Sequence, residues 1–204
     1  MSSQKSAPDR GKNKPRKRAP RNPSARKQQI IDAAADLIAQ EGSRRITNRA
    51  VAERANVPLG STTQYFKNID ELRRAGLAEL SRRIEKEYDD VFPLVEQGHD
   101  DRETIAAAIT AYISDRNRVR ADAALYAAAI DDPAVRDIAK KNFEAFLERC
   151  KPYMDLNRAK IFFAFTEGAL IEAYITGKTY DEGLIREAIS LILGEELGTP
   201  GTAD

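Results

Sequence analysis

The chain has 204 residues, which is enough for one domain of ordinary size with a second, smaller one attached. Its 42% hydrophobic and 32% charged residues are typical of a soluble globular protein, and no apolar run approaches the roughly 18 residues of a membrane span. The net charge of +1 conceals an uneven distribution, because residues 1–25 carry +7, residues 26–74 carry +3 and residues 75–204 carry −9.

The N-terminal segment, residues 1–25, is rich in Ser, Pro, Lys and Arg and has no large apolar residue after Met1, a composition typical of disorder. This basic arm either keeps the protein in solution or lies along a polyanion such as DNA, with Arg16, Lys17 and Arg18 as candidate phosphate contacts. No apolar segment or cleavage site follows it, which argues against a signal peptide, so we expect a cytoplasmic protein.

Helical periodicity begins at Arg26, where apolar residues recur every three or four positions up to a capping Gly42. Thr47 has the properties of an N-cap, so a second, short helix is predicted after it. Pro58 suits the first position of a third helix, which reaches Phe66. A short helix, a tight turn and a short polar helix form the helix-turn-helix arrangement, whose second member enters the major groove of DNA.

The third predicted helix lies in "VPLGSTTQYF", residues 57–66, which concentrates hydroxyl and amide groups on about two turns. We interpret Gln64 and the three hydroxyl residues Ser61, Thr62 and Thr63 as hydrogen-bonding groups that face the groove. Gly60 would let the backbone approach DNA closely. The alternative is a polar turn on the surface, which leaves its position directly after a helix-turn pattern unexplained.

The remainder of the chain also reads as helical, and no convincing strand is found. A long helix from Ile69 is expected to stop near Pro93, and another is predicted at about 103–118. After a less regular stretch that breaks at Pro133, helices are predicted at about 134–150, 157–176 and 181–194. The fold class is therefore all-α, with a basic arm at 1–25, a three-helix DNA-binding head at 26–72, a larger helical body at 73–198 and a disordered tail at 199–204.

The stretch "TNRAVAERANVPLGSTTQYFKNIDEL" resembles the TetR-type one-component transcriptional regulators. Their pattern T-x-x-x-(I/V)-A-x-x-A-(G/N)-V-x-x-G-(T/S)-x-Y-x-(H/Y)-F-x-x-K-x-x-L is matched at Thr47, Val51, Ala52, Ala55, Val57, Gly60, Ser61, Tyr65, Phe66 and Leu72. Two positions depart from it: Thr63 replaces a tyrosine that often touches phosphate, and Ile69 replaces a lysine. Lys67 and the free N–H groups of the next helix are candidate substitutes.

The resemblance implies a DNA-reading surface on the head. Thr47 either caps its helix, touches a phosphate or does both, and Arg49 either reads a base or is simply solvated. The predicted DNA contacts are Thr47, Arg49, Gly60, Ser61, Thr62, Thr63, Gln64, Tyr65 and Lys67, with Arg16, Lys17 and Arg18 of the arm.

The resemblance also implies a ligand cavity among the middle helices of the body. Aromatic residues at helical spacing are otherwise plain core. Glu167 is unusual because it stands in an otherwise apolar helix, where it faces a polar ligand, a partner chain or solvent. The candidate ligand contacts are Tyr112, Tyr126, Phe143, Phe146, Phe162, Phe163 and Glu167.

The last two predicted helices are more hydrophobic than one small domain requires. The resemblance implies that they form a four-helix bundle with the same pair from a second subunit, which would present two heads to a palindromic site. The predicted interface residues are Gly168, Ala169, Ile185, Ala188, Ile189 and Ile192.

The working hypothesis is a homodimeric transcriptional regulator, a repressor, that binds double-stranded operator DNA and a small-molecule inducer. One alternative is a DNA-binding dimer whose body takes no ligand. The other is a helical enzyme, for which one histidine, His99, one cysteine, Cys150, and no glycine-rich phosphate loop are a poor inventory. We therefore expect no catalytic residue, cofactor or metal, and Cys150 and His99 are interpreted as structural.

Overall fold

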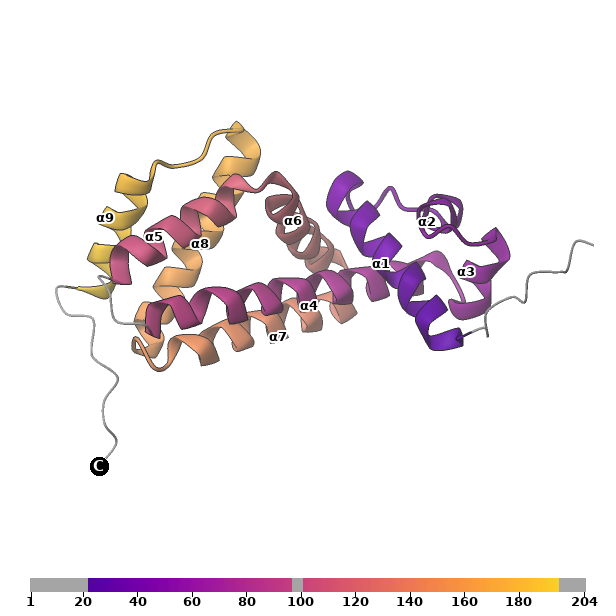
Figure 1. Ribbon diagram of the computed structural model, residues 1–204, viewed down its shortest axis with the longest axis horizontal. Coiled ribbons are helices and arrows are strands. Elements are labelled where there is room, and N and C mark those ends of the chain that lie inside the picture. Colours follow the sequence, from indigo (N-terminus) through magenta and orange to yellow (C-terminus); the bar gives the residue numbers. More distant parts are fainter. Residues whose placement is uncertain (1–21, 97–100, 195–204) are drawn as a thin grey trace, which may run out of the picture.

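The computed structural model describes residues 22–96 and 101–194. Within these ranges the chain is all-α, as predicted, with a head at one end, a body at the other and α4 running between them (Figure 1). The helices are α1 (Pro23–Glu41), α2 (Asn48–Arg54), α3 (Leu59–Tyr65), α4 (Ile69–Glu96), α5 (Asp101–Ser114), α6 (Arg116–Asp131), α7 (Pro133–Cys150), α8 (Leu156–Thr176) and α9 (Glu182–Leu193).

The head consists of α1, α2 and α3, each started by a local signal in the sequence. The Asn22 side chain accepts a hydrogen bond from the Ala25 N–H, so α1 begins at Pro23. This start is three residues earlier than Arg26, where the helical periodicity of the sequence begins. The Thr47 hydroxyl accepts from the Ala50 N–H at 3.1 Å and caps α2, as predicted. Asn56 adopts a left-handed φ of 50° in the turn that leads into α3.

Helix α4 ties the head to the body. Leu72 and Leu77 near its start are fully buried in the core that α4 shares with α1. Gly76 lies where the two helices cross, because a Cβ at this position would sit 2.8 Å from Cδ1 of Ile38 and 3.2 Å from the backbone N of Ala35. The prediction that the helix stops near Pro93 is wrong: α4 reaches Glu96, since a proline so near the end removes only one of the last hydrogen bonds.

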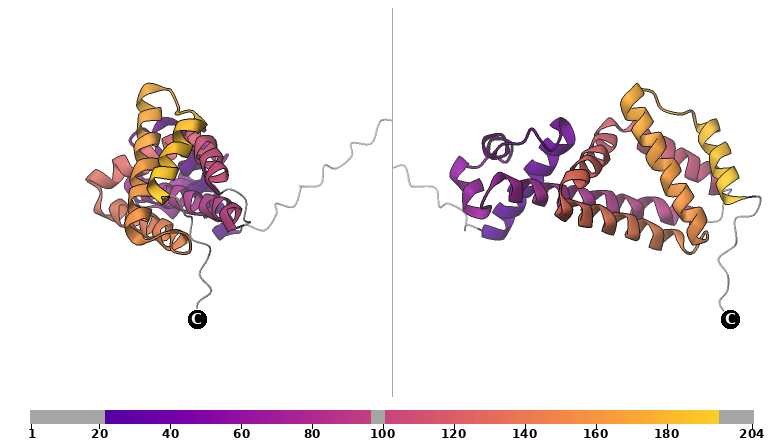
Figure 2. Two further views of the ribbon diagram at one scale, coloured as in Figure 1. Left: turned by 90° about the vertical axis from the view of Figure 1, so that its left-hand side faces the viewer. Right: turned by 180° about the vertical axis from the view of Figure 1, so that it is seen from behind.

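The body contains one helix boundary that the periodicity missed. The predicted helix at about 103–118 is two helices, because Asp115 ends α5 and caps α6 by accepting hydrogen bonds from the N–H groups of Asn117 and Arg118. Figure 2 shows α7 alongside α4 from behind, with α8 and α9 at the far end of the body. The stretch predicted to be less regular is the continuous helix α6.

Head and body are joined by charged contacts around the end of α6. Arg44 pairs with Asp131 at 2.7 Å, and Arg74 of α4 pairs with Asp132 at 2.7 Å. Because α1 also packs against both α4 and α6, the position of the head depends on these two helices.

Candidate functional site

The outer surface of α3 carries the polar groups expected of a DNA-reading helix. Gly60, Thr63 and Gln64 are exposed, and Ser61 is half-buried. A Cβ at Gly60 would meet no atom within 4 Å, so the glycine leaves open space on this surface. Because α3 follows α2 across a tight turn, the head has helix-turn-helix geometry with these groups on its second member.

Thr62 is a correction to the sequence interpretation. Its side chain is fully buried, and its hydroxyl donates to the Leu59 carbonyl oxygen at 2.8 Å, so it cannot face a groove. A seven-residue helix must bury one side to stay attached to the head, and Thr62 lies on that side together with half-buried Tyr65. The Thr63 hydroxyl is exposed and donates to the Gly60 carbonyl oxygen at 3.2 Å.

The remaining predicted DNA contacts lie on the surface of the head. Thr47 is exposed although its hydroxyl caps α2. Arg49 is 83% exposed and pairs with Glu53 at 2.9 Å. Because exposed ion pairs contribute little free energy, this pair can break at little cost when Arg49 binds elsewhere. Lys67 is exposed, and its backbone N–H donates to the Glu71 carboxylate at 2.7 Å. The arm residues Arg16, Lys17 and Arg18 lie outside the described residues.

Gly60→Ala separates the stability of the head from DNA binding. The added methyl group has free space, and alanine favours a helix over glycine, so the free energy of unfolding should rise by up to about 1 kcal/mol. If backbone and DNA meet closely at this position, affinity for a bound duplex should fall by about tenfold. Thermal unfolding and fluorescence-anisotropy titration measure the two effects. Unchanged DNA affinity would show that α3 does not approach DNA at Gly60.

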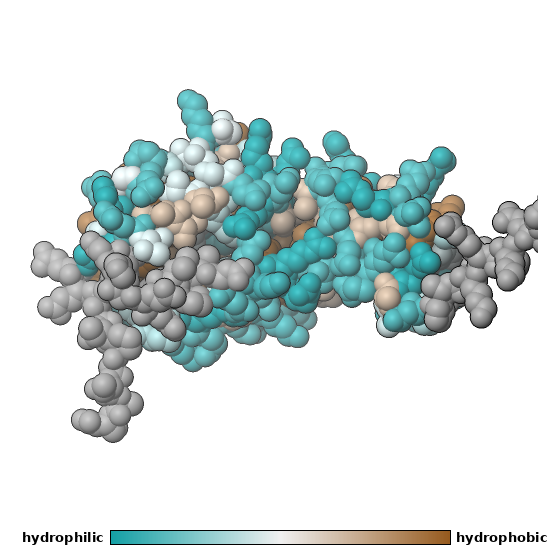
Figure 3. Space-filling model, viewed as in Figure 1, coloured by the Kyte–Doolittle hydropathy of each residue, from teal (hydrophilic) through white to brown (hydrophobic). Residues whose placement is uncertain are grey.

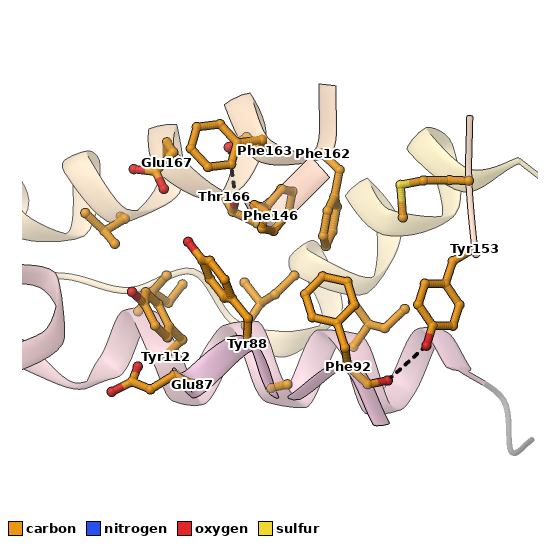
Figure 4. Close-up of a pocket in the computed structure, with 16 residues that line it drawn as sticks. Glu87, Tyr88, Phe92, Tyr112, Phe146, Tyr153, Phe162, Phe163, Thr166 and Glu167 are labelled. Carbon is orange, nitrogen blue, oxygen red and sulfur yellow. Dashed lines mark hydrogen bonds between the residues drawn. The ribbon is translucent and has the colours of Figure 1, made fainter. Parts of the chain in front are cut away.

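The body holds a partly open cavity of about 110 Å³ between α4, α5, α7 and α8. Figure 4 shows aromatic rings from these helices converging on it, with Glu87 and Glu167 at one end. Phe146 lies at the centre of the aromatic cluster, 5.1 Å from Phe163 and 5.5 Å from Tyr88 between ring centroids. The cavity is lined by Glu87, Tyr88, Phe92, Ile105, Ala108, Ile109, Tyr112, Ile113, Phe146, Tyr153, Met154, Phe162, Phe163, Thr166, Glu167 and Leu170.

The lining agrees with the sequence prediction in part. Tyr112, Phe146, Phe162, Phe163 and Glu167 are lining residues. Two predicted contacts are corrections, because Tyr126 and Phe143 are not lining residues and each instead contacts one: the hydroxyl of Tyr126 reaches the Glu167 carboxyl, and Phe143 packs edge-on against Phe163 at 4.7 Å between centroids.

Helix α4 supplies three lining residues that the sequence interpretation missed, Glu87, Tyr88 and Phe92. The candidate ligand contacts named from the sequence include no residue of α4. Tyr88 and Phe92 nevertheless continue the four-residue spacing of the buried residues Leu80 and Ile84, so the periodicity contained a signal for them.

Two carboxyl groups stand at this end of the cavity: that of Asp122, which is buried, and that of Glu167, a half-buried residue whose Oε2 atom is buried. Burial, together with the negative charge of Asp122, raises the pKa of Glu167 to about 8. Burial also raises the pKa of Asp122 to about 7, against the opposing effect of a short hydrogen bond from the Tyr112 hydroxyl. Burial raises the pKa values of Tyr88, Tyr112 and Tyr126 as well, so these phenols stay neutral. Cys150 is buried, which raises the pKa of its thiol to about 12 and agrees with a structural role.

The predicted dimer residues divide between the core and the surface. Ile185 and Ile189 are fully buried within the chain and Ala169 is 3% exposed, so these three are corrections: they form the core of the body. Gly168 is exposed, and Ala188 and Ile192 are half-buried. The side chains left free on the outer side of the two helices, which we call the α8/α9 apolar face, are Ile161, Ile171, Ile175, Leu184 and Leu191.

No group of three or more His, Cys, Asp or Glu residues in the described ranges is arranged to hold a metal ion. Within the same ranges, none of the helices combines the length and the apolar character that a membrane crossing requires. The view in Figure 3 is mostly hydrophilic over the middle of the molecule and paler towards α5 and α9. His99 lies outside the described residues.

Comparison with known sequences matches the head. Residues 30–75 fit the family described as "Bacterial regulatory proteins, tetR family". The HTH-type nicotine-responsive transcriptional repressor HdnoR of Paenarthrobacter nicotinovorans is 35% identical over 81 residues, which is 40% of this chain and 40% of the repressor. The chain therefore spans about two fifths of the length of the curated relatives that it matches.

Comparison with solved structures extends over head and body. A member of the TetR family from Streptomyces coelicolor A3 is 29% identical with a TM-score of 0.71, covering 83% of this chain and 98% of that one. The multidrug binding protein EbrR complexed with proflavin is 30% identical with a TM-score of 0.70, covering 82% of this chain and 99% of that one. Other structures of EbrR hold ethidium and malachite green.

Proposed function

The chain belongs to the TetR family of bacterial regulatory proteins, and on that premise we propose that it is a homodimeric repressor that releases a palindromic operator when its body binds a small molecule. As a member of this family it is a DNA-binding transcriptional regulator and not an enzyme. The observation that carries the proposal is the course of α4, which begins in the core of the head and lines the cavity of the body.

Operator binding is assigned to the exposed side of α3 and to the start of α2. Gln64, Thr63 and Ser61 supply hydrogen-bond donors and acceptors for base edges. Arg49 is exposed, so its guanidinium would exchange the ion pair with Glu53 for a contact with a guanine or a phosphate. Thr47 and Lys67 flank this surface and suit phosphate contacts. The arm at 1–25, with its charge of +7, would add affinity for DNA that depends on salt but not on sequence.

Dimerisation is assigned to the α8/α9 apolar face. Ile161, Ile171 and Ile175 recur at spacings of ten and four residues, so they lie on one side of α8, and Gly168 lies between them with no atom near its missing Cβ. A second copy that brings the same face would bury these side chains around a two-fold axis. Two heads would then meet half-sites one helical turn apart, roughly 34–36 Å, or a multiple of that distance.

A ligand would act by widening the cavity. At about 110 Å³ it is smaller than the roughly 300–1,000 Å³ of pockets for drug-sized molecules, so an occupant must push the surrounding helices apart. The aromatic lining suits a flat aromatic molecule, and the dyes bound by the similar protein EbrR support a ligand of that kind. Tyr88 and Phe92 lie on α4, so displacement there would tilt the head and weaken operator binding.

The operator is found by selecting bound sequences from random duplex DNA with the full chain and with a chain lacking residues 1–21. One inverted repeat recovered by both proteins, with a shallower salt dependence for the shorter one, is the expected result. If the shorter protein bound DNA without any sequence preference, the proposal that α3 recognises the bases of the operator would be contradicted.

The link between ligand and operator is tested by titrating proflavin into the protein alone and into its complex with excess operator. Because linkage is reciprocal, a ligand that weakens operator binding must itself bind the complex more weakly, by about 5- to 150-fold for typical couplings. The readout is the heat of binding, after subtraction of proflavin bound by the operator alone. Equal affinities would favour the alternative in which the body serves only for dimerisation.

A further inference from the structure

One end of the cavity is acidic: Glu167 lines it, and Asp122 of another helix lies behind the lining residue Tyr112; neither carboxyl group forms a salt bridge among the described residues. Glu167 of α8 points into the cavity beside Tyr88 and Tyr112 (Figure 4), and its Oε2 atom is buried without a hydrogen-bond partner among the described residues. Asp122 of α6 is 2% exposed and accepts a hydrogen bond from the Tyr112 hydroxyl. Tyr112 therefore stands between the cavity and the second carboxyl group.

The basic side chains nearest to these groups are already engaged. Arg118 of α6 lies 3.4 Å from the Glu87 carboxylate of α4 and 3.5 Å from that of Asp115. Arg149 of α7 pairs with Asp89 at 2.6 Å and lies over the ring of Tyr88. None of the 16 lining residues is Lys, Arg or His.

The titratable and charged groups around Glu167 and Asp122 are therefore mainly acidic or phenolic. They are Glu85, Glu87 and Tyr88 from α4, Tyr112 from α5, Arg118 and Tyr126 from α6, and Arg149 from α7. A carboxylate in such surroundings is unfavourable unless a positive charge stands beside it, so the empty cavity favours a neutral carboxyl group. The raised pKa values of Glu167 and Asp122 agree with this geometry.

Resting on the proposed ligand function, we propose that the cavity selects hydrophobic organic cations, and that a cation enters in exchange for one proton held by Glu167 and Asp122. On entry the O–H bond of one carboxyl group breaks, the proton passes to solvent water and the carboxylate stays beside the cation. The net charge of the filled cavity then equals that of the empty one for a ligand with a single charge. The rings of Tyr88, Tyr112 and Phe163 line the same cavity, and aromatic rings attract organic cations.

The exchange makes cation binding depend on pH with a defined sign. Below about pH 8 a proton must leave before the carboxylate can meet the ligand, so affinity weakens as the pH falls. One released proton corresponds to a change in affinity of about tenfold per pH unit in that range. Above the pKa the carboxylate is already ionised, and the dependence levels off. An uncharged ligand of the same shape gains nothing from the carboxylate and shows no such rise.

The test is calorimetric titration of the full chain, without DNA, with ethidium as a permanent cation and phenanthridine as an uncharged ring system of related shape. We expect ethidium affinity to rise by about tenfold per pH unit between about pH 6 and pH 8, while phenanthridine affinity stays constant. Repetition in two buffers with different heats of ionisation should show about one proton released per ethidium bound and none per phenanthridine.

Glu167→Gln is expected to abolish most of the pH dependence and to weaken ethidium binding at about pH 8 by about tenfold or more, with phenanthridine binding retained. The matched control is Glu172→Gln on the same helix, because Glu172 is exposed and bonds to Tyr180 away from the cavity. That control should behave like the unchanged protein with both probes.

The outcomes separate the two proposals. Ethidium binding that is independent of pH and releases no proton would overturn the exchange and leave the ligand function intact. Binding of phenanthridine alone would overturn the selection of cations. Failure of both probes to bind at every pH would count against the ligand function itself, and the exchange would fall with it.

Discussion

Replacing Ile175 and Leu191 together by glutamate is expected to leave a folded monomer whose operator affinity has fallen by about 100-fold or more. Both side chains lie on the α8/α9 apolar face and are 75% and 79% exposed in the single chain, so the charges cost little within the subunit. In a two-fold interface the same charges would be desolvated without partners. A monomer offers one head to a half-site and loses the gain from simultaneous binding of two, typically 10²–10⁴.

The matched control for this variant is Ile130→Glu, because Ile130 is 74% exposed but lies at the end of α6, away from the apolar face. Light scattering after size exclusion gives the mass in solution, and anisotropy titration with the selected operator gives the affinity. The control should remain dimeric with full affinity. A double variant that stays dimeric would show that the subunits meet through another surface.

Gly76→Val is expected to lower the free energy of unfolding by about 2 kcal/mol or more and to remove DNA binding with it. The first added carbon would lie 2.8 Å from Cδ1 of Ile38 and 3.1 Å from Cβ of Ala34, which is closer than packed carbon atoms approach. Overpacking of this kind typically costs about 1–3 kcal/mol. Because α1 and α4 cross here, relief of the clash would shift α1 and the head that it supports.

Valine also has a lower helix propensity than alanine, and Ala78→Val measures this effect alone, because Ala78 is exposed two residues further along the same helix. We expect this control to lower the free energy of unfolding by about 0.5 kcal/mol. Chemical denaturation measures both variants, and DNA binding is compared at a temperature where each is folded. Equal stability of the two valine variants would mean that α1 and α4 separate readily at Gly76.

The carboxyl groups of Glu167 and Asp122 also affect the stability of the empty protein. Their pKa values in the folded protein are raised above ordinary values, so they contribute stability at low pH that is lost as the pH rises through about 7 and 8. A bound cation should offset that loss. Ligand selection and the pH dependence of folding therefore arise from the same arrangement of acids in an aromatic cavity.

Most of the head could be predicted from local signals in the sequence, with the burial of Thr62 as the exception. Thr47 marks the start of α2, and the spacing of Val51, Phe66 and Leu72 follows from which sides of short helices must be buried. These are local signals, so they survive without knowledge of the rest of the molecule. The starts of α7, α8 and α9 also lie close to the predicted positions, because local caps set them: Asp132, Asp155 and Asp181 accept hydrogen bonds from the first N–H groups.

Which apolar side chains remain exposed depends on how the helices pack against one another. Periodicity shows that α9 has apolar residues on more than one side, but only packing against α5 and α8 assigns Ile185 and Ile189 to the core and leaves Leu191 exposed. In the same way Tyr88 lines the cavity while Tyr126 does not, although both are half-buried tyrosines packed against the same core. A cavity exists where several helices fail to fill the space between them, and that depends on contacts between segments far apart in the chain.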